Sequence, residues 1–299
     1  MSYSTWSASR ARSGSLTRAG IRAGIRAGIR AGIRAGGMLA LAGVALTMPA
    51  SEVGAQTDYY NLDRGRPLRV EDALPIERHA VEWQLAPVRL SGARGAGSTL
   101  DLEPELAWGL WPRTQLEVGV PLARLRREGG STVGGAGVDV AVLHALNTET
   151  TSLPALAISA RALLPAGPFG PSRPIPTITA LATRTFSAGR LHLNASASPG
   201  QYRPSDRVDE GARWEVGVAA DHSFVFQALL VGADLVVRRP LVGDDAPEWS
   251  MATGVRYQVG PRLGIDAGVG RGLSPGDEWF VTFGSALSLS LLHRFGGVR

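Results

Sequence analysis

The stretch WFVTFGSALSLSLLHRF, residues 279–295, changes character from one residue to the next. One set of alternate positions is large and apolar: Trp279, Val281, Phe283, Leu287, Leu289, Leu291 and Phe295. The other set is mostly small or polar: Phe280, Thr282, Gly284, Ala286, Ser288, Ser290 and Arg294. Because successive side chains of a strand point to opposite faces, this pattern predicts a strand with one apolar face. Such a strand fits either a β-sandwich or a β-barrel.

The same alternation recurs through most of the chain. Leu100, Leu106 and Trp108 share one face of the stretch 100–110, and residues 115–122 and 263–269 alternate in the same way. Turn residues separate these stretches, and no long helical pattern interrupts them. We therefore predict an all-β chain with about 12 antiparallel strands between residues 78 and 295.

The connections between these stretches alternate between short and long. The short ones are 111–114, 147–152, 187–190, 220–223 and 259–262, and the long ones are 126–135, 165–174, 199–211, 238–248 and 271–278. An even strand count with this alternation is typical of a transmembrane barrel with short periplasmic turns and longer outer loops. Trp residues near strand ends, at positions 108, 111, 214, 249 and 279, agree with aromatic girdles. One or two periplasmic β-sandwiches are the alternative architecture.

The N-terminus is expected to be removed. A repeated RAGI unit spans Arg18–Gly37, an apolar run follows at 38–48, and small residues precede Gln56 at Val53-Gly54-Ala55. A basic region, a short apolar region and a small-residue cleavage site predict a secretory signal peptide over residues 1–55. This segment holds seven of the 31 basic and one of the 26 acidic residues, so the remainder carries 24 and 25 and a net charge of −1. The apparent basicity therefore does not indicate a nucleic-acid partner.

Two terminal segments fall outside the alternating region. Residues 56–77 are charged and do not alternate, and residues 296–299 follow the closing strand as a short tail. The first segment could be a periplasmic extension, a plug in the barrel mouth, or a flexible N-terminus.

If the apolar positions face lipid, the alternate positions face the lumen and carry many charges. The lumen-facing candidates are Glu82, Asp101, Glu103, Glu105, Glu117, Asp139, Arg161, Arg213, Arg256, Asp266 and Arg294, together with Glu215 and Asp234. The early strands supply acids and the later strands supply the arginines, so we predict an acidic wall opposite an arginine-containing wall. Such a pore would orient polar solutes. Alternatively, the charges pair and fill a barrel of this size.

Catalytic and metal sites are weakly indicated. His192, Asn194 and Ser196 share one face of a stretch, as in barrel lipases that use a His, Ser and Asn group, but polar residues are the default on a lumenal face. Five scattered His residues show no metal-ligand spacing, and the chain has no Cys. The loop acids Asp206, Asp209, Glu210, Asp244 and Asp245 could bind divalent cations or be solvated. We expect no cofactor and no catalytic residue.

The chain resembles bacterial outer-membrane transporter-like barrels, including the family named for the MetA pathway of phenol degradation. Residues 109–122, 152–165, 255–273 and the closing strand carry this resemblance. It implies a barrel in the cell outer membrane with a role in the passage of small solutes, hydrophobic or aromatic ones included. The strand ending at Phe295 also resembles the C-terminal signal read by the barrel assembly machinery. The alternatives are a non-conducting structural or surface-interaction barrel and a barrel lipid hydrolase.

Overall fold

The computed structural model describes residues 61–85, 88–93, 96–127, 130–199, 212–224, 228–241, 246–274 and 278–290. The predicted signal peptide, Arg294, Phe295, the C-terminal tail and all five loop acids lie outside these described residues. Every regular element within them is a β-strand. None of the described residues form a helix that is long and apolar enough to span a bilayer.

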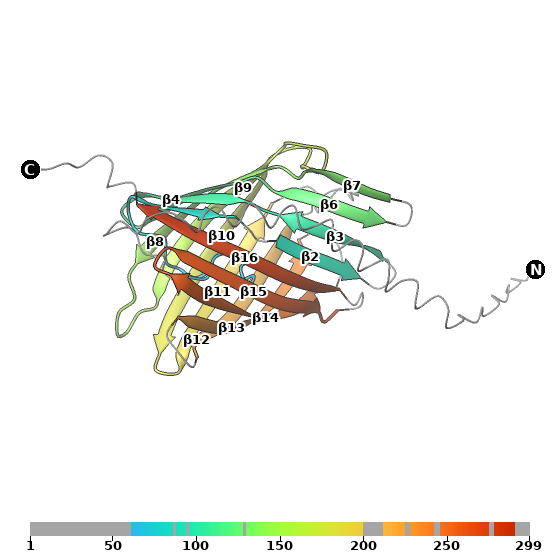
Figure 1. Cartoon of the computed structure of the whole chain (residues 1–299). Coiled ribbons are helices and arrows are strands. Elements are labelled where there is room, and N and C mark those ends of the chain that lie inside the picture. Colours follow the sequence, from blue (N-terminus) through green and yellow to red (C-terminus); the bar gives the residue numbers. More distant parts are fainter. Residues whose placement is uncertain are drawn as a thin grey trace, which may run out of the picture. The chain divides into compact units, whose positions relative to one another are not determined.

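Sixteen strand segments form one antiparallel sheet (Figure 1). The first eight are β1 (Ala80–Gln84), β2 (Val88–Ala93), β3 (Ala96–Leu102), β4 (Glu105–Trp111), β5 (Thr114–Gly119), β6 (Leu122–Arg127), β7 (Gly130–Gly135) and β8 (Val138–Asn147). The others are β9 (Ala155–Leu164), β10 (Ile175–Phe186), β11 (Gly189–Ser198), β12 (Arg213–Ser223), β13 (Leu229–Pro240), β14 (Glu248–Gly260), β15 (Leu263–Gly272) and β16 (Trp279–Ser290).

Twelve of these segments close a cylinder. The pairing runs β1-β4-β5-β8 and then through β9 to β16 in sequence order, and β16 pairs with β1, where Gln84 lies opposite Ala286. Closure removes the exposed sheet edges that an open antiparallel sheet would leave. The prediction of a 12-stranded antiparallel barrel is confirmed, and the sandwich alternative is wrong.

The remaining four segments continue barrel strands beyond a break. Each continues one barrel strand: β2 continues β1, β3 continues β4, β6 continues β5 and β7 continues β8. For example, β16 pairs with β1 through its C-terminal half and with β2 through its N-terminal half. Pro104 and Pro121 lie in two of the breaks, where a residue without an amide N–H cannot donate to the ladder. The amide of Val120 still bonds the Pro104 carbonyl at 3.0 Å, so the neighbouring strands stay joined across the breaks.

The two ends of the barrel differ in their connections. At the turn end, the strands join through short links such as Pro112-Arg113 and residues 187–188, and at the loop end through longer ones such as 165–174. Two predicted connections are wrong. Residues 220–223 belong to β12, whose link to β13 is 224–228, and residues 126–135 are mostly the hairpin of β6 and β7.

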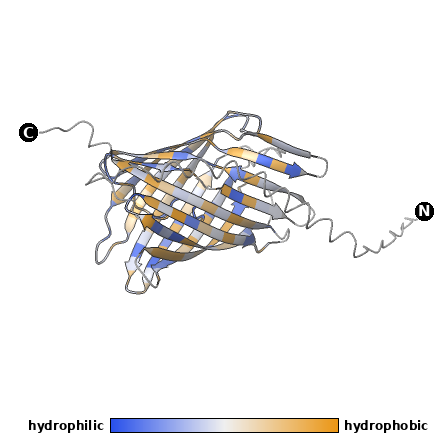
Figure 2. Cartoon of the chain, in the orientation of Figure 1, coloured by the Kyte–Doolittle hydropathy of each residue, from blue (hydrophilic) through white to orange (hydrophobic). Residues whose placement is uncertain are grey.

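The outer face is apolar, as the alternation predicts. Hydrophobic and less hydrophobic residues alternate along the strands (Figure 2). In β16, Val281 and Phe283 are 43% and 55% exposed, whereas Thr282 between them is 2% exposed. Large apolar side chains are exposed in the same way along the other barrel strands. A water-soluble protein rarely exposes such a continuous apolar surface, so this face is suited to lipid.

Candidate functional site

A chain segment, residues 61–77, lies inside the barrel and is named the lumenal segment below. Leu62, Leu68 and Val70 are each at most 2% exposed and pack against inward-facing residues of β12, β13, β14 and β16. The wall partners of its polar groups are Arg256 of β14, Asp266 of β15, Glu82 of β1, Asp234 of β13, Arg190 of β11, Thr183 of β10 and Gln115 of β5. Because these strands surround the lumen, the segment crosses its interior.

The wall is shaped to receive this segment. Gly232, Gly254 and Gly268 lie side by side on β13, β14 and β15. A Cβ added at Gly254 would lie 2.6 Å from Pro67 Cβ, and one added at Gly268 would lie 2.6 Å from the Pro67 carbonyl oxygen. These three residues are named the glycine shelf. Any side chain on the shelf would occupy the space that the lumenal segment fills.

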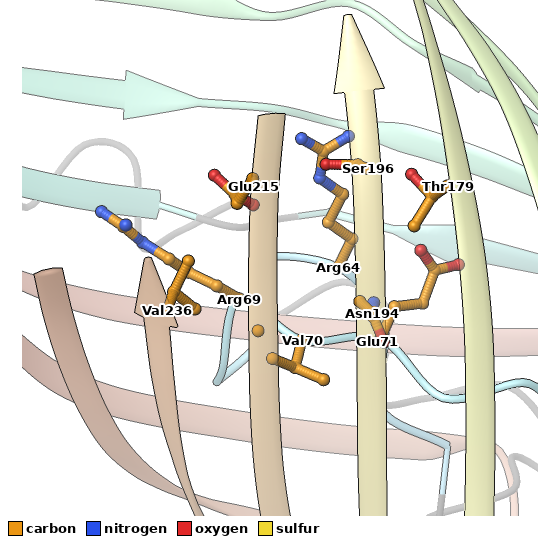
Figure 3. A pocket seen from close by; sticks show the side chains of 10 residues that line it. Arg64, Arg69, Val70, Glu71, Thr179, Asn194, Ser196, Glu215 and Val236 are labelled. Carbon is orange, nitrogen blue, oxygen red and sulfur yellow. The ribbon is translucent and has the colours of Figure 1, made fainter. Parts of the chain in front are cut away.

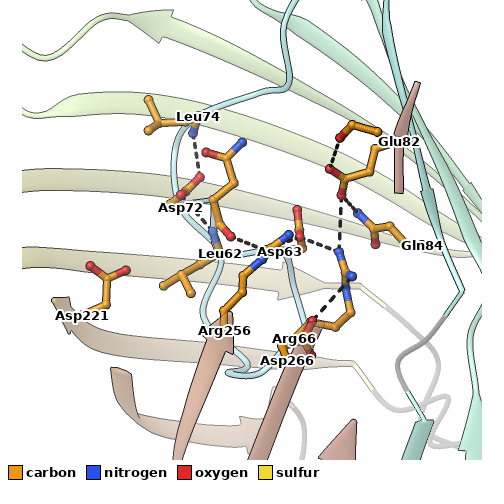
Figure 4. Close-up of polar contacts among 12 residues, drawn as sticks. Leu62, Asp63, Arg66, Asp72, Leu74, Glu82, Gln84, Asp221, Arg256 and Asp266 are labelled. Atoms are coloured by element: carbon orange, nitrogen blue, oxygen red, sulfur yellow. Dashed lines mark hydrogen bonds and ion pairs between the residues drawn. The ribbon is translucent and has the colours of Figure 1, made fainter. Parts of the chain in front are cut away.

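One charge cluster joins the turn at the start of the segment to the wall (Figure 4). Asp63 pairs with Arg66 at 2.5 Å and with Arg256 at 2.9 Å, and Arg256 also donates to the carbonyl of Asn61. Arg66 in turn lies 3.6 Å from Glu82 and 3.7 Å from Asp266. Burial opposes ionisation of Asp63, but the two guanidiniums hold its pKa below the usual value. Glu82, Arg256 and Asp266, all predicted lumenal charges, thus meet through residues of the segment.

A second cluster lies on four adjacent strands of the wall. Arg161 of β9 contacts Glu117 and Asp139 at 2.5 Å each and Glu105 at 3.8 Å. Ala141 lies between Glu117 and Arg161 in the same row, and its small side chain leaves room for the pair. We predicted from the sequence that Arg161 lies opposite the acidic wall. That prediction is wrong, because Arg161 lies among the acids. One guanidinium therefore lies among three carboxylates, which reduces the expected field between two opposed walls on this side without cancelling it.

A third set of contacts fixes the middle of the segment. The amide of Ala73 donates to Thr183 Oγ1 at 2.9 Å, and that oxygen lies 3.0 Å from His192 Nδ1. His192 Nε2 lies 3.2 Å from an Asp221 oxygen, and Asp221 is held by Arg190 at 2.7 Å. Both ring nitrogens of the buried His192 are thus engaged, which leaves neither to activate Ser196.

Ser196 and Asn194 border a small cavity together with Glu71 and Arg64 of the segment (Figure 3). Its volume of about 20 Å³ is enough for about one water molecule. Burial, with Glu117 nearby, raises the pKa of Glu71 to about 8. Burial likewise raises the pKa of Asp72 to about 6, despite the nearby Arg190. The middle of the lumen is therefore closely filled by the docked segment.

A larger cavity opens toward the loop end and is named the vestibule. Its volume is about 660 Å³, and Arg69 of the segment, Arg89 of β2 and Phe280 of β16 line it. Asp101, a predicted lumenal charge, lines it as well. A volume of this size is typical of small-molecule sites. The lumen is therefore open at the loop end, where the vestibule lies, and is filled by the lumenal segment in its middle.

The other predicted residues are placed less centrally. Glu103 lies at the break between β3 and β4 and is half-buried, and Arg213 begins β12 and is half-buried. Sequence reasoning missed Asp63, Arg66, Arg190 and Asp221, although the charge-rich letters DRGR and VED of residues 63–66 and 70–72 could have drawn attention to the first two.

Comparisons with known proteins place the fold. No protein-family model matches the sequence, and the curated proteins gave no significant match. Among solved structures, the COG4313 outer membrane channel from Pseudomonas putida F1 is 11% identical with a TM-score of 0.52, covering 76% of this chain and 100% of that one. The NanC porin is 8% identical with a TM-score of 0.51, covering 69% and 98%.

At such low sequence identities, these likenesses show the fold alone. The chain has the fold of an outer-membrane β-barrel. Its resemblance to the family of the MetA pathway stays a prediction.

Proposed function

We propose that this protein mediates passive or facilitated passage of small solutes, hydrophobic or aromatic ones included, across the cell outer membrane. In this proposal the lumenal segment is a plug that must shift before solutes pass. The apolar outer face supports a location in lipid, and the vestibule supports entry of solutes from the loop end.

The proposal includes processing and assembly. Residues 1–55 act as a signal peptide, cleavage after Ala55 leaves a chain that starts at Gln56, and the closing strand to Phe295 is read by the barrel assembly machinery. Outer-membrane lipids and a small solute are then the partners, and nucleic acid is not.

The observation that carries the proposal is the way the segment is held. In the described residues, the segment forms no ladder with the wall, and its one bridge joins Asp63 to Arg66 within the segment itself. Its attachment consists of side-chain contacts and of packing on the glycine shelf. The segment can therefore move without breaking any hydrogen bond between barrel strands.

Planar-bilayer conductance of the refolded chain starting at Gln56 tests the proposal. We expect discrete but infrequent current steps, and more frequent steps for Arg256→Ala, which removes the ion pair with Asp63. The reversal potential across a salt gradient measures ion selectivity, which Glu103→Ala should shift toward anions. A folded protein and a folded Arg256→Ala variant that both stay silent would contradict passage.

Silence would favour the alternative of a non-conducting structural or surface-interaction barrel. The filled middle of the lumen supports that alternative, since the cavity beside Ser196 holds only about 20 Å³. The lipid-hydrolase alternative finds no support in the arrangement around His192, where Thr183 and Asp221 occupy both ring nitrogens.

A further inference from the structure

Two arginines share one aromatic ring at the floor of the vestibule. The Arg89 guanidinium lies 3.7 Å from the centroid of the Phe280 ring, and the Arg69 guanidinium lies 5.2 Å from it. Phe280 is 4% exposed, so the ring is a buried support that positions both cations. One arginine belongs to the barrel wall and the other to the lumenal segment.

Acids lie near both cations without forming a close ion pair in the described residues: Asp101 is the cross-strand partner of Arg89, and Asp234 accepts the backbone amide of Arg69. Within the described part of the chain, no carboxylate oxygen lies within 4.0 Å of the guanidinium of Arg69 or Arg89, whereas Arg238 at the same cavity pairs with Glu248 at 2.6 Å. Arg69 Nη1 donates to Ser250 Oγ at 2.7 Å. In the described residues this is the one hydrogen bond made by either guanidinium, and since each has five N–H donors, most donors of the pair remain for a solute.

We infer that the vestibule is a binding site for small organic carboxylates, held by hydrogen bonds from Arg69 and Arg89. A carboxylate is planar and can accept two parallel hydrogen bonds from a guanidinium. The cavity of about 660 Å³ admits the rest of such a solute, and Leu125 supplies apolar lining. The inference rests on the proposed passage function and names its class of solute.

The site also connects the solute to the plug. The backbone amide of Arg69 donates to Asp234 of β13 at 2.6 Å, which fixes this part of the segment on the wall. A carboxylate bound to Arg69 therefore contacts the segment, while its contact with Arg89 keeps it on β2.

Titration calorimetry of the refolded chain starting at Gln56 with benzoate tests the inference, with benzamide as the neutral probe of the same size. We expect benzoate to bind and benzamide to bind at least tenfold more weakly. Arg89→Gln and Arg69→Gln should each weaken benzoate binding at least tenfold at fixed ionic strength. Arg124→Gln is the matched control, because Arg124 is an exposed residue of β6 that lies opposite Leu100 of β3.

Benzoate binding that is equal in wild type and in both Gln variants, or equal for benzoate and benzamide, would overturn the inference. If the Gln variants do not fold, Arg89→Lys and Arg69→Lys replace them; they keep the charge but lose the planar fork, and we expect several-fold weaker binding. Unchanged binding in both Lys variants would equally overturn it. Benzoate binding without conductance would support the site and contradict passage, and conductance without benzoate binding would do the reverse.

Discussion

Arg256 of β14 and Asp63 of the lumenal segment form an ion pair of 2.9 Å, although they are 193 positions apart in the chain. Arg256 is 1% exposed, and Arg66, Glu82 and Asp266 complete its charged surroundings. The pair is the most direct charged link between the barrel and the segment inside it. Its removal therefore tests the role of the segment.

Replacing Arg256 by Gln should destabilise the folded protein. The buried carboxylates of Asp63, Glu82 and Asp266 would keep only Arg66, and breaking a buried pair from one side costs roughly 3–5 kcal/mol. Urea unfolding of the refolded barrel measures the loss. Arg124→Gln, which removes an exposed arginine from β6, should change stability by less than about 0.5 kcal/mol. Equal stabilities of the two variants would contradict the importance of the pair.

Adding a side chain to the glycine shelf should displace the segment. In Gly254→Val the new Cβ lies 2.6 Å from Pro67 Cβ and 2.8 Å from the Ala267 carbonyl oxygen of β15. Because β15 is held by its pairing with β14 and β16, we expect the segment to undock and the frequency of current steps to rise. The matched control is Gly260→Val on the same strand, because a Cβ there meets nothing within 4 Å. If both variants conduct like the wild type, the segment does not obstruct the lumen.

Docking of the segment should weaken as the pH rises. The pKa of Glu71 is raised to about 8 and that of Asp72 to about 6, so each acid is more readily protonated when docked than in water. Their contribution to docking is therefore complete in acid and is lost as the pH passes about 6 for Asp72 and about 8 for Glu71.

Conductance between pH 5 and 9 checks this dependence. The groups facing Glu71 are Glu117, Arg161, Arg64 and Asp63, and those facing Asp72 are Arg190, His192 and Asp63. We expect step frequency to increase with pH in the wild type and Glu71→Gln to flatten the upper part of the rise. A wild-type profile that is flat or falls with pH would contradict the prediction.

His192 should matter for structure and not for ester hydrolysis. His192→Ala leaves Thr183 and Asp221 without their shared partner, and we expect it to lower stability by about 2–4 kcal/mol. Ser196→Ala should leave stability within about 1 kcal/mol and change no activity toward a chromogenic ester. Hydrolysis by the wild type that Ser196→Ala abolishes would restore the hydrolase alternative.

Much of the wall could be predicted from sequence, because strand side chains alternate with a period of two and the lipid face must be apolar. The faces of β16 follow from that rule, and the total of 12 barrel strands follows from it together with the turn residues that separate the stretches. The alternation did not predict the hairpin of β6 and β7, because the Gly-rich residues 129–135 have the composition of a loop.

The contents of the lumen could not be predicted in the same way. The lumenal segment has no periodicity, and its contacts join residues such as Ala73 and Thr183 that are 110 positions apart. The position of Arg161 depends on the register of β5, β8 and β9, which sets Glu117, Ala141 and Arg161 in one row. The pattern of residues within a single strand cannot predict which residues of neighbouring strands lie in one row.

The glycine shelf has a consequence for the mechanics of the barrel. Glycine in a strand is less constrained than alanine, and it weakens a strand by roughly 0.5–1 kcal/mol per residue. Three such residues on β13, β14 and β15 should make this part of the wall more pliable, and the docked Pro67 and Leu68 pack against it. Departure of the segment would thus clear the lumen and soften the wall beside it in a single event.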